Sequence, residues 1–285
     1  MKIITFLHRI IVLVITFMGS ISFSQDYGLK DHLIFYSSFD GKAAADFAVG
    51  DAEIYTAISP KEIAEAKPGL LNPDVELATG KGFVGDALNF KKKSKMITFY
   101  KGKRNMGYNR ESWSGTVSFW LQLDPEKDLE PGYCDPIQIT DVTYNDAALW
   151  VDFTKDNPRD FRLGVIGDIA VWNPEKKDEQ VKMEKRLVRV KEPPFHREGW
   201  THVVMRFSQL NTNGAKHELF INGESKGAVE GISDSFTWDE ERSRIMLGLN
   251  YIGLMDEITI FNKALDKEAV KAIYRMKNGI KSILN

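Results

Sequence analysis

The chain has 285 residues, with 38 Lys and Arg against 40 Asp and Glu and a single cysteine, Cys134. A slightly acidic protein lacks the basic surface on which nucleic-acid binding depends, so nucleic acid is excluded as the expected partner. A lone cysteine also excludes an intrachain disulfide, so the apolar core must hold the fold. All-β sandwiches of roughly 200 to 250 residues form one domain. We therefore expect one domain over residues 25–285, with its core over about residues 30–276.

The first residues predict export. Lys2 and Arg9 precede an apolar run over residues 10–18, and small and polar residues follow it to Ser24. This pattern is typical of a secretory signal peptide over residues 1–24. The alternative is a membrane anchor, but the apolar run is shorter than the roughly 20 residues that a bilayer span needs. With no cysteine near the cut to carry a lipid, we expect a secreted or periplasmic protein without a membrane span after processing.

Next along the chain come a long irregular stretch, residues 41–80, and a basic segment. Residues 61–67 could form a short helix that ends at Pro68-Gly69. The basic segment carries Lys91, Lys92, Lys93 and Lys95, followed by Lys101, Lys103 and Arg104. Such runs are usually a solvated strand edge or loop, and the alternative is a docking patch for an anionic polysaccharide.

From about residue 115, short stretches of alternating apolar and polar residues predict β-strands. Three such series have an apolar face and a mixed face, and their apolar members are Val117, Phe119, Leu121 and Leu123, then Leu149, Val151 and Phe153, then Phe161, Leu163 and Val165. Asn222-Gly223 predicts a tight hairpin, since both central residues of a type I′ turn need positive φ. Near the end, Asp266 can cap a helix with apolar residues at helical spacing, ended by Gly279.

Several segments, in order, resemble the laminin-G-like jelly roll of the concanavalin-A-like lectin and glucanase superfamily. They are Phe39-Asp40, residues 83–90 (FVGDALNF), 115–120 (GTVSFW), 199–204 (GWTHVV), 219–223 (LFING), 246–248 (MLG) and 253–258 (GLMDEI), with 264–268 (ALDKE) opening the last helix. The chain also resembles exported bacterial proteins of this class. The resemblance implies an all-β, two-sheet antiparallel sandwich with a short C-terminal helix, and a lectin-like role. Two insertions, residues 41–80 and 172–197, depart from the compact pattern.

The mixed faces of the strands suggest a ligand site. If the strands from Gly115 to Ile221 form mostly one sheet, their polar and aromatic members point away from the core together: Trp120, Gln122, Gln138, Trp150, Asp152, Arg162, His202 and Arg206. Flat rings that stack on sugar C–H faces, beside planar amide, carboxylate and guanidinium groups, suit a polysaccharide. The alternative is that the insertions cover Trp120 and Trp150, while Asp152 and Arg162 form a structural ion pair.

Asp256 shares its parity with the apolar residues Ile258 and Ile260, which predicts an inward-pointing carboxylate. A lone buried carboxylate is costly unless it is paired or metal-bound. By resemblance, related jelly rolls often hold Ca²⁺ with aspartates that match Asp40 and Asp256. The alternative is a carboxylate that accepts hydrogen bonds from loop N–H groups.

Enzymatic alternatives follow from the same superfamily. Its glycosidases carry a Glu-x-Asp-x-x-Glu strand segment, which the chain lacks. Its lyases need a Tyr or His base and a group that neutralises a uronate; His202, Gln138, Arg162 and Tyr144 could fill those roles by residue type. We therefore expect a non-catalytic glycan-binding protein, with a polysaccharide lyase or glycoside hydrolase as the alternative. A structural or adhesive protein with a protein partner, which would need an exposed apolar patch, is a second alternative.

Overall fold

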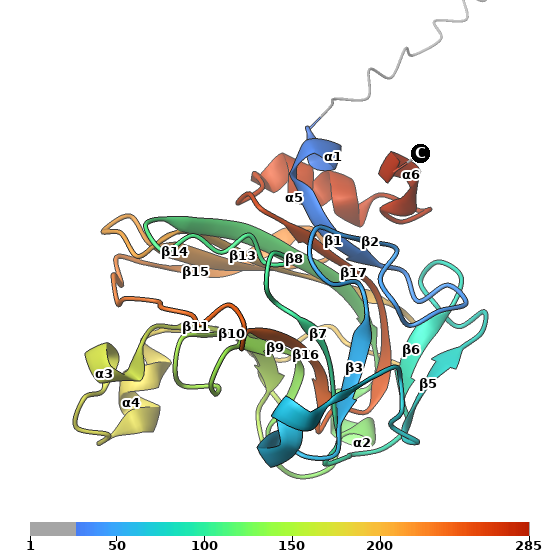
Figure 1. The fold of residues 1–285 in the computed structure, drawn as a ribbon, viewed down its shortest axis with the longest axis horizontal. Coiled ribbons are helices and arrows are strands. Elements are labelled where there is room, and N and C mark those ends of the chain that lie inside the picture. The colour runs from blue at the N-terminus through green and yellow to red at the C-terminus, as the bar shows by residue number, and fades with distance from the viewer. Residues whose placement is uncertain (1–26, 285) are drawn as a thin grey trace, which may run out of the picture.

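The computed structural model describes residues 27–284 and consists of two antiparallel β-sheets stacked face to face (Figure 1). This confirms the expected all-β jelly-roll sandwich. The predicted signal peptide, residues 1–24, lies outside the described residues. Within the described part of the chain, no helix is both long and apolar enough to cross a membrane.

The first sheet, here called sheet A, contains both long central strands of the fold. Its order is β15 (Glu224–Glu230), β14 (Lys216–Ile221), β13 (Thr201–Leu210), β8 (Trp113–Gln122), β17 (Gly253–Phe261), β1 (Leu33–Ser37) and β2 (Phe47–Ala48). Two further strands extend it at one end of β17, namely β6 (Ala87–Phe90) and, beside it, β5 (Val75–Ala78).

The second sheet, sheet B, takes up the middle of the sequence and part of the first insertion. Its order is β12 (Leu187–Val190), β11 (Phe161–Ile166), β10 (Ala148–Phe153), β9 (Cys134–Thr140), β16 (Arg244–Leu249), β7 (Ile97–Lys101), β3 (Ile54–Ala57) and β4 (Lys67–Pro68).

The main core fills the space between the two sheets. All ten apolar residues of the three alternating series belong to it, among them Phe119 from sheet A and Val151 and Leu163 from sheet B, which are fully buried. Alternation places every second side chain on one face of a strand, so each series delivers its apolar face to the core. The predicted hairpin also forms: Asn222 and Gly223 link β14 to β15 with φ of 52° and 77°.

The helices are short and lie on the outside of the sandwich or at its ends. They are α1 (Leu29–His32), η1 (Pro60–Glu65, a 3₁₀ helix), α2 (Pro125–Asp128), α3 (Ile169–Trp172), α4 (Glu179–Glu184), α5 (Lys267–Tyr274) and α6 (Lys281–Leu284). The helix expected over residues 61–67 is thus a 3₁₀ helix that ends at Glu65, and Lys67–Pro68 form β4 instead. Asp266 caps α5 as predicted, with its Oδ1 accepting from Ala269 N at 2.8 Å. However, α5 ends at Tyr274, well before Gly279.

The outer faces of the two sheets are covered differently. α1, α5 and α6 lie over sheet A (Figure 1), where Val270 and Ile273 of α5 join an apolar cluster with Val204 and Phe220. The insertions cover the two ends of sheet B: Met183 of α4 packs near Trp150, and Ile63 of η1 packs beside Phe99. Between these two covers, the middle of the outer face of sheet B stays uncovered.

Candidate functional site

The structure divides the eight candidate ligand residues between opposite faces of the molecule. Trp120, Gln122, His202 and Arg206 lie on β8 and β13 of sheet A, whereas Gln138, Trp150, Asp152 and Arg162 lie on β9, β10 and β11 of sheet B. The expectation that they share one face is therefore wrong. The chain leaves sheet A after Gln122, builds four strands of sheet B, β9 to β12, and returns to sheet A, where β13 pairs with β8.

On sheet A, the aromatic candidate is buried. The Trp120 ring stacks on Phe83 with 3.6 Å between ring centroids, and it lies 5.8 Å from the ring of Tyr274, which belongs to α5. Only 5% of Trp120 is exposed. Its ring faces are therefore occupied by protein and do not offer a stacking surface to a ligand.

The polar candidates of sheet A are also engaged. His202 is fully buried, its Nε2 lies 2.8 Å from Ser118 Oγ, and burial lowers its pKa to about 3. Arg206 donates to Glu218 Oε2 at 2.9 Å, and Gln122 donates to the carbonyl of Arg197 at 2.8 Å. His202 cannot act beside Gln138, Arg162 and Tyr144 as the lyase alternative required, because Gln138 and Arg162 lie on the other sheet and Tyr144 lies in the turn between β9 and β10.

On sheet B, the four candidates do lie together. Trp150 is directly opposite Gln138 on β9 and Gly164 on β11, and Asp152 is opposite Arg162. The indole lies against the backbone of Gly164, where an added Cβ would come within 2.4 Å of the ring, so only glycine fits there. Trp150 Nε1 donates to the carbonyl of Tyr144 at 2.8 Å. With Trp172 and Met183 packed nearby, only 2% of Trp150 is exposed.

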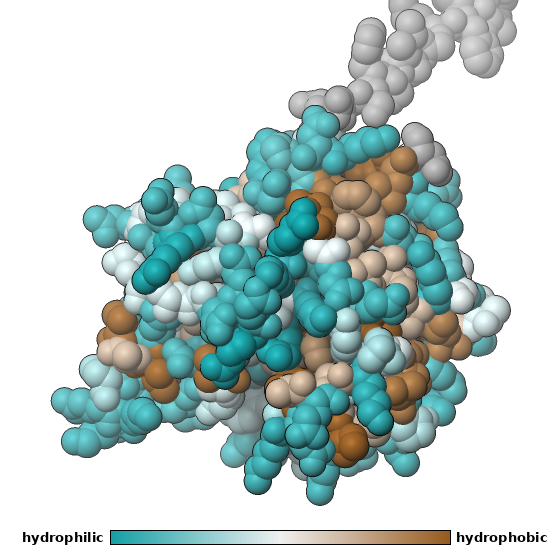
Figure 2. Space-filling view, viewed as in Figure 1, coloured by the Kyte–Doolittle hydropathy of each residue, from teal (hydrophilic) through white to brown (hydrophobic). Residues whose placement is uncertain are grey.

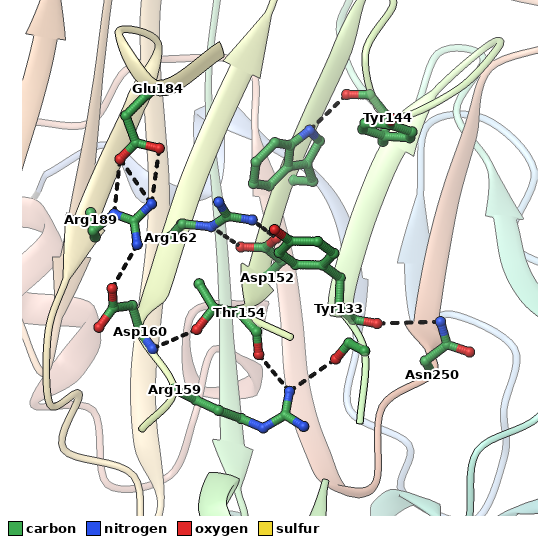
Figure 3. Close-up of polar contacts among 12 residues, drawn as sticks. Tyr133, Tyr144, Asp152, Thr154, Arg159, Asp160, Arg162, Glu184, Arg189 and Asn250 are labelled. Carbon is green, nitrogen blue, oxygen red and sulfur yellow. Dashed lines mark hydrogen bonds and ion pairs between the residues drawn. The ribbon is translucent and has the colours of Figure 1, made fainter. Parts of the chain in front are cut away.

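Asp152 and Arg162 form a buried ion pair (Figure 3). Arg162 Nε donates to Asp152 Oδ1 at 2.8 Å, and Nη2 donates to Oδ2. The guanidinium carbon lies 5.0 Å from the centroid of the Tyr133 ring, which is cation–π distance. The two side chains therefore bind each other through two hydrogen bonds, as the structural alternative for these two residues anticipated.

A cavity of about 340 Å³ opens above these residues, and its rim carries side chains that the pattern of strands did not reveal. Tyr133 and Tyr144 are 37% and 45% exposed and supply the accessible rings. Tyr133 precedes β9 and belongs to no alternating series, so no sequence signal pointed to it. Its backbone carbonyl accepts from Asn250, another lining residue, at 3.3 Å (Figure 3).

Asp135 also lines this cavity and was not predicted. Burial, followed by the negative charge of Asp152, raises its pKa well above the usual range for a carboxyl group. Among the described residues, no hydrogen bond to its side chain forms. A β-bulge in the pairing of β9 with β10 shifts the register between Val151 and Phe153. Since such a bulge changes which residues face the same side, simple alternation could not place Asp135 beside Asp152.

A second, larger cavity of about 830 Å³ adjoins the first. The two share Gln138, Leu249 and Asn250 in their walls, so they form one groove across the outer face of sheet B, here called the sheet B groove. Residues of α4 line one end and residues of η1 line the other. The lower outline of the molecule is indented between these two helices (Figure 2).

An ion-pair network holds the α4 end of the groove in place. Arg189 of β12 donates from Nε and Nη2 to Glu184 at the end of α4, both at 2.9 Å, and from Nη1 to Asp160 at 2.6 Å (Figure 3). Below it, the buried Arg159 donates to the carbonyls of Gly132 and Thr154. These contacts tie the second insertion and the loop that precedes β9 to the edge of sheet B.

Asp256 does not point into the core. Glu257 has φ of 54°, and the register of β17 against β8 shifts between Asp256 and Thr259. This bulge reverses the parity, so Asp256 faces the same side as its partner Trp120, while Ile258 remains in the core. The inward orientation inferred from alternation is therefore wrong.

The two candidate metal ligands accept hydrogen bonds from the loop between β5 and β6. Asp256 Oδ2 accepts from Val84 N at 3.1 Å, and Asp40 Oδ1 accepts from Asp86 N at 2.9 Å. Ca²⁺ needs about six to eight oxygens. Within the described part of the chain, no group of three or more His, Cys, Asp and Glu side chains is placed to hold a metal. Calcium at Asp40 and Asp256 would therefore need backbone carbonyl oxygens to complete its shell, and it stays a prediction that melting curves with calcium and with EGTA would test.

No family model and no curated protein sequence matches the chain. Solved structures do match its fold. Domain 4 of AbnA, a GH43 extracellular arabinanase from Geobacillus stearothermophilus, solved in complex with arabinotriose, aligns over 85% of this chain and 98% of that domain, with 18% identity and a TM-score of 0.51.

The binding domain of botulinum neurotoxin DC, solved in complex with rat synaptotagmin II, aligns over 87% of this chain with 11% identity and a TM-score of 0.58. The binding domain of botulinum neurotoxin serotype D aligns over 87% with 16% identity and a TM-score of 0.54. The matches cover only 52% of each neurotoxin chain, about half of its length. At these identities the likeness concerns the β-sandwich fold.

Proposed function

We propose that the protein is an exported, non-catalytic carbohydrate-binding protein of the laminin-G-like type, secreted or periplasmic, and that a polysaccharide lies in the sheet B groove. The observation that carries the proposal is the groove itself, two adjoining cavities of about 340 and 830 Å³ that share Gln138 and Asn250. An elongated groove of this kind suits a chain-like ligand better than a compact one.

The chemistry of the smaller cavity supports a sugar. Tyr133 and Tyr144 present partly exposed rings that can stack on the C–H face of a pyranose or furanose. Gln138 and Asn250 supply amides that can pair with neighbouring hydroxyls as donor and acceptor. Trp150 cannot stack on a sugar as the sequence suggested, since it is buried beneath α4. In this proposal Tyr133 and Tyr144 supply the stacking rings instead.

The structural neighbours are consistent with this proposal. One of them holds arabinotriose, and others are the binding domains of botulinum neurotoxins. These neighbours share the same β-sandwich fold. Because a shared fold alone does not carry a function, the neighbours support a binding role only, and the proposed ligand class rests on the groove.

The proposal is tested by retention of the purified protein on a panel of neutral, uronate-bearing and sulfated polysaccharides, with the absorbance of unsaturated products and the release of reducing ends followed in parallel. We expect retention without product. Tyr133→Ala and Tyr144→Ala should each weaken binding about tenfold, the loss expected for one stacking ring of about 1–1.5 kcal/mol. The proposal fails if the folded protein retains none of the polysaccharides.

Hydrolysis is the second candidate, and one observation favours it. Asp135 and Asp152 both line the smaller cavity, and Asp135 has a raised pKa, as a general acid of a glycosidase requires. The ion pair with Arg162 commits Asp152 to a structural contact, which favours binding over catalysis. Release of reducing ends by the wild type that Asp135→Asn abolishes would establish the hydrolase.

A further inference from the structure

The two halves of the sheet B groove differ in charge. The smaller cavity is lined by the carboxyl groups of Asp135, Asp152 and Glu184 and by one cation, Arg162. The larger cavity reverses this composition, with one carboxyl group, Asp141, and four cations, which are Lys61, Lys95, Arg242 and Arg244. A ligand that spans the groove therefore meets an acidic end and a basic end.

Most of the neighbouring basic segment is neutralised, which makes the larger cavity distinctive. Lys91 pairs with Glu76 at 3.0 Å, Lys92 with Asp74 at 3.1 Å and Lys101 with Asp51 at 3.0 Å; Lys103 pairs with Glu241. The structural interpretation of this segment thus applies to these four lysines. By contrast, the ion pairs within residues 27–284 include none of the four cations of the larger cavity.

Arg244 is the most enclosed of the four cations. Its guanidinium carbon lies 5.6 Å from the centroid of the Phe99 ring, and its Nε is buried without a hydrogen-bond partner in the described structure. An unpartnered buried donor carries a desolvation cost that an acceptor from a ligand would relieve. Arg242, whose backbone carbonyl accepts from Arg244, extends the same positive wall.

Lys61 and Lys95 complete the site from the other side. Lys61 lies on η1, in the first insertion, and Lys95 lies in the turn between β6 and β7. Both are exposed, and both line the larger cavity with Arg242 and Arg244. Four cations from three separate segments therefore converge on one hollow with a single carboxyl group to balance them.

We propose that the larger cavity binds the anionic group of an acidic polysaccharide, a carboxylate or a sulfate ester, while the smaller cavity stacks a neighbouring sugar ring on Tyr133 and Tyr144. This inference rests on the proposed function and names its ligand class. The guanidinium groups would form charge-assisted hydrogen bonds to the anion, and the two lysines would add point charges at the rim.

The test compares the double variant Lys61→Gln/Lys95→Gln with the matched control Lys263→Gln/Lys277→Gln. The control removes two exposed lysines that are likewise absent from the ion pairs of the described residues, and both lie near α5 on the sheet A side. Affinities are measured at low and high salt for a neutral, a uronate-bearing and a sulfated polysaccharide. Neither pair of lysines is part of the core, so both variants should fold.

We expect the groove variant to bind the acidic polysaccharide about fivefold more weakly at low salt, a loss that high salt reduces, and to bind the neutral one unchanged. The control should match the wild type. A preference for the uronate or for the sulfate arm identifies the anion. Binding of the neutral glycan with no preference for either acidic one, or acidic binding that the groove variant leaves unchanged, overturns the inference while the glycan-binding function stands. No binding to any of the three overturns both.

Discussion

Asp152 and Arg162 lie almost completely buried at the floor of the sheet B groove, with 6% and 8% of their side chains exposed. Two charges removed from water are tolerated because each satisfies the other through two parallel hydrogen bonds. Arg162 also lies at cation–π distance from the ring of Tyr133, and the charge of Asp152 adds to burial in raising the pKa of Asp135 while Arg162 lowers it. A contact that is structural in itself thereby shapes the binding surface above it.

Removal of one partner should be costly. Asp152→Ala leaves the Arg162 guanidinium buried without its carboxylate, and we expect a loss of about 3–5 kcal/mol in the free energy of unfolding. Urea denaturation measures it, with Asp156→Ala as the control, because Asp156 is exposed. A loss below about 1 kcal/mol would contradict the strong coupling described for the pair.

The buried acids Asp256 and Glu257 predict a decline of stability with rising pH. Burial, with the charge of Glu257 as the next cause, raises the pKa of Asp256 to about 8, and burial raises the pKa of Glu257 to about 7. Since the folded protein holds these protons more tightly than the unfolded chain, the stabilisation is present at low pH. It is lost as the pH rises through the folded pKa values.

Urea unfolding at about pH 6 and about pH 8 should show a loss of about 3–4 kcal/mol in the free energy of unfolding of the wild type. Glu257→Gln removes one of the two titrating groups and should roughly halve that loss, whatever its effect on absolute stability. Parallel curves for the wild type and the variant would show that Glu257 does not titrate in this range.

At the scale of elements, short helices from outside the core strands decide which sheet face is open. α5 lies over sheet A because its apolar side is buried against Val204 and Phe220. η1 and α4 come from the two insertions and cover only the ends of sheet B. The groove is therefore a product of the insertions: they enclose it at both ends and leave the middle strands uncovered.

The cap of α5 can be tested directly. Asp266→Ala removes the carboxylate that accepts from Ala269 N, and we expect a loss of about 1 kcal/mol in the free energy of unfolding. Glu268 lies in the first turn of the same helix but is exposed, so Glu268→Ala should lower the free energy of unfolding by only a few tenths of a kcal/mol. Thermal or urea denaturation compares them, and equal losses for the two variants would argue against a capping role.

At the scale of the whole molecule, the two outer faces of the sandwich differ in how far they are covered. The outer face of sheet A is closed by α5 and by the Phe83 loop, and His202, Arg206 and Gln122 each make a hydrogen bond within the protein. The outer face of sheet B carries both cavities of the groove. Substitutions on the two faces should therefore affect different measurements.

Trp120→Ala should lower the free energy of unfolding by about 3–5 kcal/mol, the usual cost of removing a buried tryptophan, with no change in glycan affinity of the folded protein. Tyr133→Ala should weaken glycan binding with little change in the free energy of unfolding, because Tyr133 lies at the rim of the cavity and is partly exposed. Unfolding curves and binding isotherms on the same samples separate the two effects. Loss of affinity in a folded Trp120 variant would return the site to sheet A.

The sequence by itself determined the alternating strands of the second half of the chain, their core residues and the local turns, but not the short strands β2 to β5, which lie in the stretch over residues 41–80 that was expected to be irregular. Alternation identified Phe119, Val151 and Leu163 as core residues, Asn222-Gly223 marked the hairpin, and Asp266 marked the helix start. Each of these depends on neighbours a few residues apart. Backbone geometry then carries the pattern into the fold without reference to the rest of the chain.

Only the tertiary structure decided which face each strand presents to solvent. Trp120 and Trp150 have the same local pattern, yet they lie on opposite sides of the sandwich, because pairing between distant strands assigns them to different sheets. The bulge at Glu257 turned Asp256 outward, and the bulge between β9 and β10 brought Asp135 into the groove. One extra residue in a strand reverses every later side chain, and the packing of the whole sheet determines where that residue falls.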